Sequence, residues 1–149
     1  MFLTVHGAIG IIIGQQIKNP LFAFLAGFFS HYLFDLIPHG DTKAPEKWKN
    51  PIHIATAALI DLILLIIFLL YLGTKIQILN LNTALAFFGA VLPDFLQGFY
   101  FLSNKKIFKV HQNIHNFFHF LLADRWEWKF STGIIFQMII FIFLITLIL

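Results

Sequence analysis

Residues 52–72 read IHIATAALIDLILLIIFLLYL, and this unbroken apolar run decides the fold class. About 20 helical residues cross the roughly 30 Å hydrocarbon core of a bilayer, so the run predicts a transmembrane helix. The runs are continuous rather than alternating, which indicates helices and not strands. Three more runs are long enough or nearly so, and one is shorter: Leu21–Ile37, Ala84–Leu102, Phe130–Leu149 and the short Phe2–Gly14.

The composition supports a membrane protein of one domain, residues 1–149. Hydrophobic residues make up 59% of the chain and charged residues 11%, and the mean hydropathy is +0.84. We expect an all-α polytopic bundle of about five hydrophobic helices, with an interfacial amphipathic helix at His111–Ala123. The first hydrophobic helix is short, and it is re-entrant unless Gln15, Gln16 and Ile17 extend it.

The basic residues predict the orientation of the bundle. With five crossings, eight of the ten Lys and Arg residues fall on the side of the N-terminus. The positive-inside rule makes that side cytoplasmic, with the C-terminus outside, in a bacterial-type inner (plasma) membrane. The net charge of +3 does not indicate nucleic-acid binding, because the basic residues lie at the membrane borders. A thin bundle of this kind is compatible with a homodimer.

Ionisable residues gather at one end of the predicted bundle. An imidazole or carboxylate in hydrocarbon costs several kcal/mol unless a partner compensates, so such residues are usually functional. The chain has no cysteine, and a metal would therefore be held by imidazole and carboxylate groups. The residues are His6, His31, Asp35, His39, Asp41, Asp61, Asp94, His111, His115 and His119.

The densest motif is SHYLFDLIPHGD at residues 30–41. His31 and Asp35 are four residues apart and share one face of a helix. Pro38 predicts that the helix ends near residue 36 or 37, so His39 and Asp41 follow on a turn and can reach the same ion. The alternative is a buried hydrogen-bonded pair of His31 and Asp35 beside two solvated loop residues.

Three histidines, His111, His115 and His119, follow at intervals of four. A histidine pair with this spacing is a common zinc-binding arrangement. The first and third are about 12 Å apart along a helix, so two can share an ion. The third is then left for a second metal, a substrate phosphate or nothing. The alternative is an interfacial helix whose histidines face lipid headgroups.

Two further aspartates and one histidine lie within apolar runs. Asp94 follows a proline in GAVLPD and would bridge metals or orient a water, unless it only caps or hydrogen-bonds a helix. His6 is a ligand or a neighbour of ligands, beside glycines at 7, 10 and 14 that allow close helix packing. Asp61 hydrogen-bonds a ligand histidine or pairs with His53.

The motifs VHGAIG, SHYLFDLIPHGD, GAVLPD and HQNIH resemble signatures of the membrane-bound metal-dependent hydrolases, a family that includes LexA-regulated inner-membrane proteins. The order of the motifs differs from the family pattern, and its Asp-x-Asp-His tail is replaced by Asp94-Phe-Leu-Gln97. The resemblance implies metal-dependent hydrolysis and a set of ligands: His6, His31, Asp35, Asp94, His111 and His115.

The leading hypothesis is therefore a metal-dependent hydrolase with one or two divalent ions, zinc above all. Asp94 or Asp41 would act as general base. The substrate would be a small-molecule or lipid phosphate, and the membrane lipid itself is a partner.

A non-catalytic metal carrier or sensor and a small scaffold are the alternatives. Transport is disfavoured, because the outer halves of the helices carry few polar residues (Gln15, Gln16, Gln77 and Gln137). Four lysines flank the motifs and could hold an anionic headgroup: Lys43, Lys47, Lys105 and Lys106.

Overall fold

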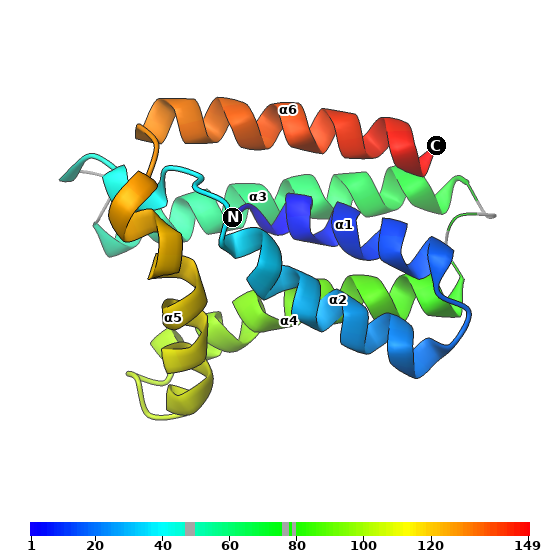
Figure 1. Ribbon diagram of the computed structural model, residues 1–149, viewed down its shortest axis with the longest axis horizontal. Coiled ribbons are helices and arrows are strands. Elements are labelled where there is room, and N and C mark those ends of the chain that lie inside the picture. The colour runs from blue at the N-terminus through cyan, green and yellow to red at the C-terminus, as the bar shows by residue number, and fades with distance from the viewer. Residues whose placement is uncertain (47–49, 76–77, 79) are drawn as a thin grey trace.

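The computed structural model describes residues 1–46, 50–75, 78 and 80–149, and all regular structure within these residues is helical. This confirms the predicted all-α class. Figure 1 shows most of the helices running roughly side by side, with α5 lying across their end. The elements in chain order are α1 (Leu3–Gln16), α2 (Pro20–Asp35), the 3₁₀ turn η1 (Asp41–Lys43), α3 (Pro51–Gly73), α4 (Leu81–Leu102), α5 (Lys109–Trp126) and α6 (Phe130–Ile148).

Three of these helices, α3, α4 and α6, are long and apolar enough to cross a membrane. The other two members of the bundle are shorter. Helix α1 has 14 residues and α2 has 16, which correspond to about 21 and 24 Å at 1.5 Å per residue. The expected spanning run Leu21–Ile37 therefore forms a helix that is shorter than a bilayer core, and five crossings remain a prediction.

Asparagine side chains begin three of the helices. Asn19 and Asn50 each precede a proline at the first helical position, and each accepts hydrogen bonds from backbone N–H groups of the first turn. Asn80 forms a capping box with Thr83 at the start of α4. These caps satisfy N–H groups that have no partner within the helix. At its other end α2 stops at Asp35, as the nearby Pro38 predicted.

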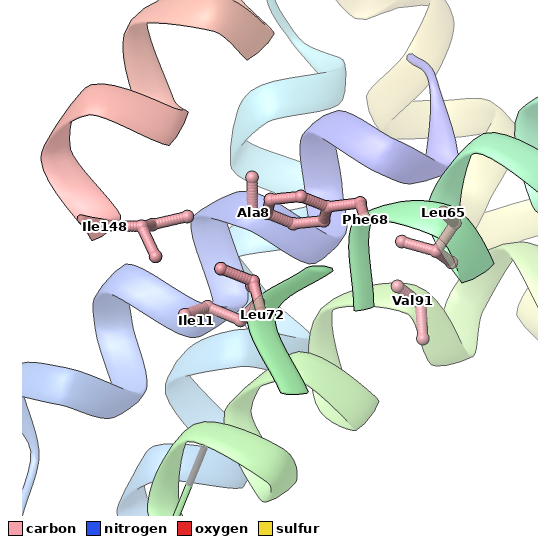
Figure 2. Close-up of a cluster of buried hydrophobic side chains, with 7 residues drawn as sticks. All are labelled: Ala8, Ile11, Leu65, Phe68, Leu72, Val91 and Ile148. Carbon is pink, nitrogen blue, oxygen red and sulfur yellow. The ribbon is translucent and has the colours of Figure 1, made fainter. Parts of the chain in front are cut away.

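Helix α1 forms the centre of the bundle although it is the shortest of the α-helices in the described residues. It packs against α2, α3, α4 and α6, and most of its residues are buried. Figure 2 shows the apolar cluster around it, in which Ala8 and Ile11 of α1 meet side chains of α3, α4 and α6. The expected close packing of its glycines is confirmed: a Cβ at Gly10 or Gly14 would meet α4 backbone at 2.7 Å or less.

Helices α2 and α4 share the most extensive interface. Their backbones touch at two glycines, because a Cβ added to Gly27 would lie 2.1 Å from the carbonyl oxygen of Ala86. One added to Gly89 would lie 2.3 Å from the carbonyl oxygen of Phe24. Small residues at such crossings are typical of helix packing in membranes. This close contact fixes the positions of the polar residues at the ends of α2 and α4.

Helix α5 lies across the end of the bundle (Figure 1), where it packs against α2 and α4. One of its faces carries the three histidines and turns toward the bundle. Another face is apolar and exposed, with four residues in helical register: Val110, Ile114, Phe117 and Leu121. This amphipathic pattern fits the helix that the sequence predicts for the membrane surface.

Candidate metal centre

Four helices bring five of the predicted residues together into what we call the first cluster: His6, His31, Asp35, Asp94 and His115. His31 and Asp35 end α2, Asp94 follows the proline of α4, and His115 reaches in from α5. Four of the five side chains are at most 3% exposed, and Asp94 is 23% exposed. The predicted convergence of distant histidines and aspartates therefore occurs.

Three ligand atoms of the first cluster lie at distances that match a tetrahedral metal site. We consider His31 Nε2, His115 Nε2, Asp35 Oδ2 and Asp94 Oδ1 as ligand atoms. Five of the six separations among them are 3.2, 3.3, 3.4, 3.6 and 3.6 Å. Bonds of about 2.0–2.1 Å to a tetrahedral zinc ion place neighbouring ligand atoms about 3.3–3.4 Å apart. His31 Nε2, His115 Nε2 and Asp35 Oδ2 are therefore spaced as if around one ion, and Asp94 Oδ1 lies 3.6 Å from both imidazole nitrogens.

The hydrogen bonds of His31 direct a lone pair into this space. His31 Nδ1–H donates to the backbone carbonyl of Ala90 at 2.8 Å, so in the neutral ring Nε2 is the unprotonated nitrogen. His31 Nε2 also faces His115 Nε2 at 3.2 Å. Two imidazole nitrogens at this distance need a cation or a proton between them.

His115 has a matching contact on its other side. Its Nδ1 lies 3.3 Å from the amide of Gln97 on α4. An amide can be turned so that its oxygen accepts from Nδ1–H, which leaves His115 Nε2 free to bind a metal. The sequence did not predict this contact of Gln97 with His115, because Gln97 was noted only as a departure from the family motif.

The two carboxylate oxygens of Asp35 have different surroundings. Oδ1 accepts from the Met1 nitrogen at 2.8 Å and lies 3.1 Å from His6 Nε2. Oδ2 is buried without a hydrogen-bond partner, and the nearest polar atoms are Nε2 of His31 and His115. A buried carboxylate oxygen left without a partner is costly. A cation bound by Oδ2 and the two histidines would satisfy it, so these residues fit a metal ion.

His6 lies beside His31 and Asp35. Its ring stacks on that of His31, with ring centroids 4.0 Å apart, and its Nε2 contacts Asp35 Oδ1. It can also form a ligand group with His31 and Asp94. The structure therefore places His6 where it either orients Asp35 or binds the ion directly.

A second cluster lies next to the first and consists of His39, Asp41 and His119. His115 and His119 are one turn apart on α5, and their rings stack with centroids 6.0 Å apart. The Met1 nitrogen lies between the clusters, 2.8 Å from Asp35 Oδ1 and 3.0 Å from His39 Nε2. Burial lowers the pKa of the Met1 amine, but the nearby carboxylates outweigh it and raise this pKa to about 10. The surroundings thus favour positive charge.

Both clusters open on one pocket of about 140 Å³. Asp94 and His115 line it from the first cluster, and Asp41 and His119 line it from the second. The rest of the lining comes from Met1, Gln97, Asn116 and Phe120. Ligand atoms of both clusters can therefore meet one small molecule.

His111 is not brought into either cluster, contrary to its prediction as a metal ligand. Its nitrogens are buried without hydrogen-bond partners, and its ring lies near Tyr32 and His115, with centroids 6.3 and 6.0 Å away. The three histidines do share a face, but α5 crosses the bundle so that only His115 and His119 meet ligand atoms. The spacing of residues along a helix predicts which of them share a face, but it does not predict where that helix crosses its neighbours.

Asp61 has a different position from the one expected. It accepts hydrogen bonds from the backbone N–H groups of Leu3 and Thr4 and from the Thr4 hydroxyl. The carboxylate of α3 thus caps the first turn of α1, which has no side-chain cap of its own. It supports the helix of His6 rather than a ligand ring.

Three of the predicted headgroup lysines, Lys43, Lys105 and Lys106, do not line the pocket. Lys43 is exposed at the end of η1. Lys105 and Lys106 are exposed in the connection at 103–108, which lies at the end of α5 away from η1 (Figure 1). Lys47 lies outside the described residues. Among the described residues, the polar groups that line the pocket are therefore cluster side chains, Gln97, Asn116 and Met1 with its amine.

Two residues distant in sequence hold the turn of His39. Gln137 of α6 is fully buried, donates to the His39 carbonyl and accepts from Phe2 N–H. Glu127 accepts from Gly40 N–H at 2.7 Å. Sequence reasoning missed both and counted Gln137 with the polar residues of the outer halves. The available signal was a lone amide in an apolar run.

Comparisons with protein families, curated proteins and solved structures found no match to this chain. The description of the protein therefore stands on its fold and its side chains. It is an all-helical protein with three candidate membrane spans and buried His/Asp groups that could hold a metal ion.

Proposed function

We propose that this protein is an integral-membrane, metal-dependent hydrolase that cleaves a phosphoester of a lipid or lipid-linked substrate. In this proposal, all five bundle helices cross an inner membrane, the N-terminus and the clusters lie on the cytoplasmic side, and the ion is zinc. The main support is the spacing of three ligand atoms in the first cluster, those of His31, Asp35 and His115, at 3.2–3.4 Å, with Asp94 Oδ1 3.6 Å from both imidazole nitrogens. The motif resemblance to membrane-bound metal-dependent hydrolases agrees with it.

Three residues are proposed as permanent ligands: His31, Asp35 and His115. Their ligand atoms form a mutually close group, and all three side chains are buried. Catalytic zinc sites commonly use three protein ligands and keep a fourth position open. A divalent ion bound there would lower the pKa of coordinated water toward about 7 and polarise the scissile group.

Asp94 is proposed as the proton acceptor at the fourth position. Its Oδ1 lies 3.6 Å from both Nε2 atoms, whereas Asp35 Oδ2 lies 3.3 and 3.4 Å from them. It also lines the pocket, whereas Asp35 does not. A carboxylate that faces both the ligand atoms and the pocket can take a proton from a water between them. Asp41, the other candidate base, belongs to the second cluster.

The position of the pocket supports a substrate at the membrane surface. The pocket lies under α5, whose opposite face is apolar and exposed. A helix of this kind rests in the headgroup layer. The pocket volume of about 140 Å³ suits a small polar group and not a whole lipid. A lipid headgroup would therefore enter the pocket while the acyl chains of the lipid stay in the bilayer.

A non-catalytic metal carrier or sensor is the second candidate, and one observation favours it. Asp94 Oδ1 lies 3.6 Å from both Nε2 atoms, and if it also binds the ion, four protein ligands complete the coordination as in structural zinc sites. The two candidates differ in the effect of Asp94→Asn. In the hydrolase, this substitution retains zinc and abolishes turnover; in a carrier, the unmodified protein has no turnover at all.

Elemental analysis of the detergent-purified protein tests the proposal. We expect stoichiometric zinc in the unmodified chain and its loss from the first site in His31→Ala and His115→Ala. His111→Ala is the matched control, because it removes a histidine from the same face of α5 outside both clusters. Phosphate release from dioleoyl phosphatidic acid in mixed micelles measures turnover. Zinc content that is negligible and equal in all four proteins would leave only the scaffold hypothesis.

A further inference from the structure

We infer that His39, Asp41 and His119 form a second metal site, so that two ions face one pocket and the substrate class is a phosphoester. The inference deepens the proposed function and rests on it for the substrate class alone. The three ligand atoms lie close together. His39 Nε2 is 3.2 Å from both His119 Nε2 and Asp41 Oδ2, and His119 Nε2 is 3.8 Å from Asp41 Oδ2.

The hydrogen bonding of His39 repeats that of His31. His39 Nδ1–H donates to the Ile37 carbonyl at 2.7 Å, so Nε2 of the neutral ring carries the lone pair. That lone pair faces a second imidazole nitrogen, a carboxylate oxygen and, at 3.0 Å, the Met1 nitrogen, whose place a bound metal ion would take. His39 is 1% exposed, and little water is available to separate the two nitrogens. Three acceptors that converge in this way bind a cation.

The second cluster stands on a backbone that is held from several sides. Gly40 has a φ of +93°, which glycine adopts without strain, and its N–H donates to Glu127. Gln137 donates to the His39 carbonyl at 3.2 Å. At Gly133, α6 touches this turn so closely that a Cβ would lie 1.9 Å from the His39 carbonyl oxygen. Buried partners that fix ligand orientation are characteristic of metal sites.

The two clusters face the same small pocket, and this arrangement supports a phosphoester as the substrate class. Asp41 and His119 line the pocket opposite Asp94 and His115. Two ions on one pocket stabilise both the attacking and the leaving oxygen in an in-line displacement at phosphorus. Water attacks phosphorus, the ester P–O bond breaks, Asp94 accepts the water proton, and the alcohol oxygen leaves with a proton from solvent.

Zinc stoichiometry in single variants tests the second site. Each protein is loaded with Zn²⁺ alone, freed of excess metal and assayed for zinc per chain. We expect two ions in the unmodified chain, one in His119→Ala, one in His115→Ala and two in the control His111→Ala. Asp41→Asn, a substitution of similar size at an exposed position, is expected to match His119→Ala, and it replaces that variant if the latter does not fold.

The outcomes separate this inference from the proposed function. One ion in the unmodified chain that persists in His119→Ala and vanishes in His115→Ala would overturn the second site and leave the first intact. No zinc in the unmodified chain would overturn both. For the substrate class, inorganic phosphate is titrated calorimetrically into the zinc-loaded protein. We expect binding that His119→Ala abolishes, and phosphate binding that is absent or unchanged in His119→Ala would overturn the phosphoester assignment.

Discussion

Replacing Gly27 with alanine should separate the two helices that carry three residues of the first cluster. Gly27 of α2 packs on the backbone of α4, where a Cβ would lie 2.1 Å from the Ala86 carbonyl oxygen, against 3.4 Å for ordinary contact. The helices would have to move apart by roughly 1 Å, and overpacking of this kind costs about 1–3 kcal/mol in folding free energy.

The same movement should weaken metal binding. Helix α2 supplies His31 and Asp35 and α4 supplies Asp94, while metal–ligand distances tolerate deviations of only about 0.2 Å. Changes that misplace ligands without removing them lower metal affinity by about 10–100-fold. We expect a loss of Zn²⁺ affinity in that range, together with a lower melting temperature.

Competition with a chromogenic zinc chelator measures the affinity, and thermal unfolding in detergent measures the stability. Gly98→Ala is the matched control, because it lies on α4 and a Cβ there has no neighbour within 4 Å. We expect it to bind zinc normally and to gain about 0.5–1 kcal/mol, as alanine replaces glycine within a helix. A Gly27→Ala protein that melts and binds Zn²⁺ like the unmodified chain would refute the link between helix contact and ligand geometry.

Three further predictions address the second cluster, the cap of α1 and the orientation. Gly133→Ala should displace the turn of His39 and lower zinc from two ions to one per chain; two retained ions would contradict the role of this contact. Asp61→Ala should remove the cap of α1 and lower stability by about 1–2 kcal/mol at unchanged zinc stoichiometry, and a melting temperature like that of the unmodified protein would speak against it. Because the chain has no cysteine, a single cysteine at Lys75 should react with an impermeant maleimide in intact bacterial cells and one at Lys43 only after lysis. The reverse pattern would invert the topology.

The local part of the metal centre could be predicted from sequence because helical geometry is periodic. The spacing of His31 and Asp35 places them on one face, and the structure finds their ligand atoms 3.3 Å apart. The proline at residue 38 sets the end of α2, which leaves His39 and Asp41 on a turn. These inferences need only the rise of a helix and the missing N–H of proline.

The partners across the bundle could not be predicted in the same way. Spacing shows that His111, His115 and His119 share a face, but the crossing of α5 over α2 and α4 decides which of them meets a ligand atom. Burial was equally hidden, because an apolar helix has the same composition whether it faces lipid or other helices. The central position of α1 is therefore a result of packing and not of its sequence alone.

The second cluster shows how strongly the site depends on residues distant from its motif. The turn at His39 and Gly40 is held by Glu127, Gly133 and Gln137, which lie about 90–100 positions later in the chain. A glutamine in the first half of α6 would be costly in hydrocarbon, and its hydrogen bonds to the turn explain why it is there. Metal binding by His39 should therefore depend on the docking of α6 against the turn, and zinc at the second site should in return stabilise α6 against separation from the bundle.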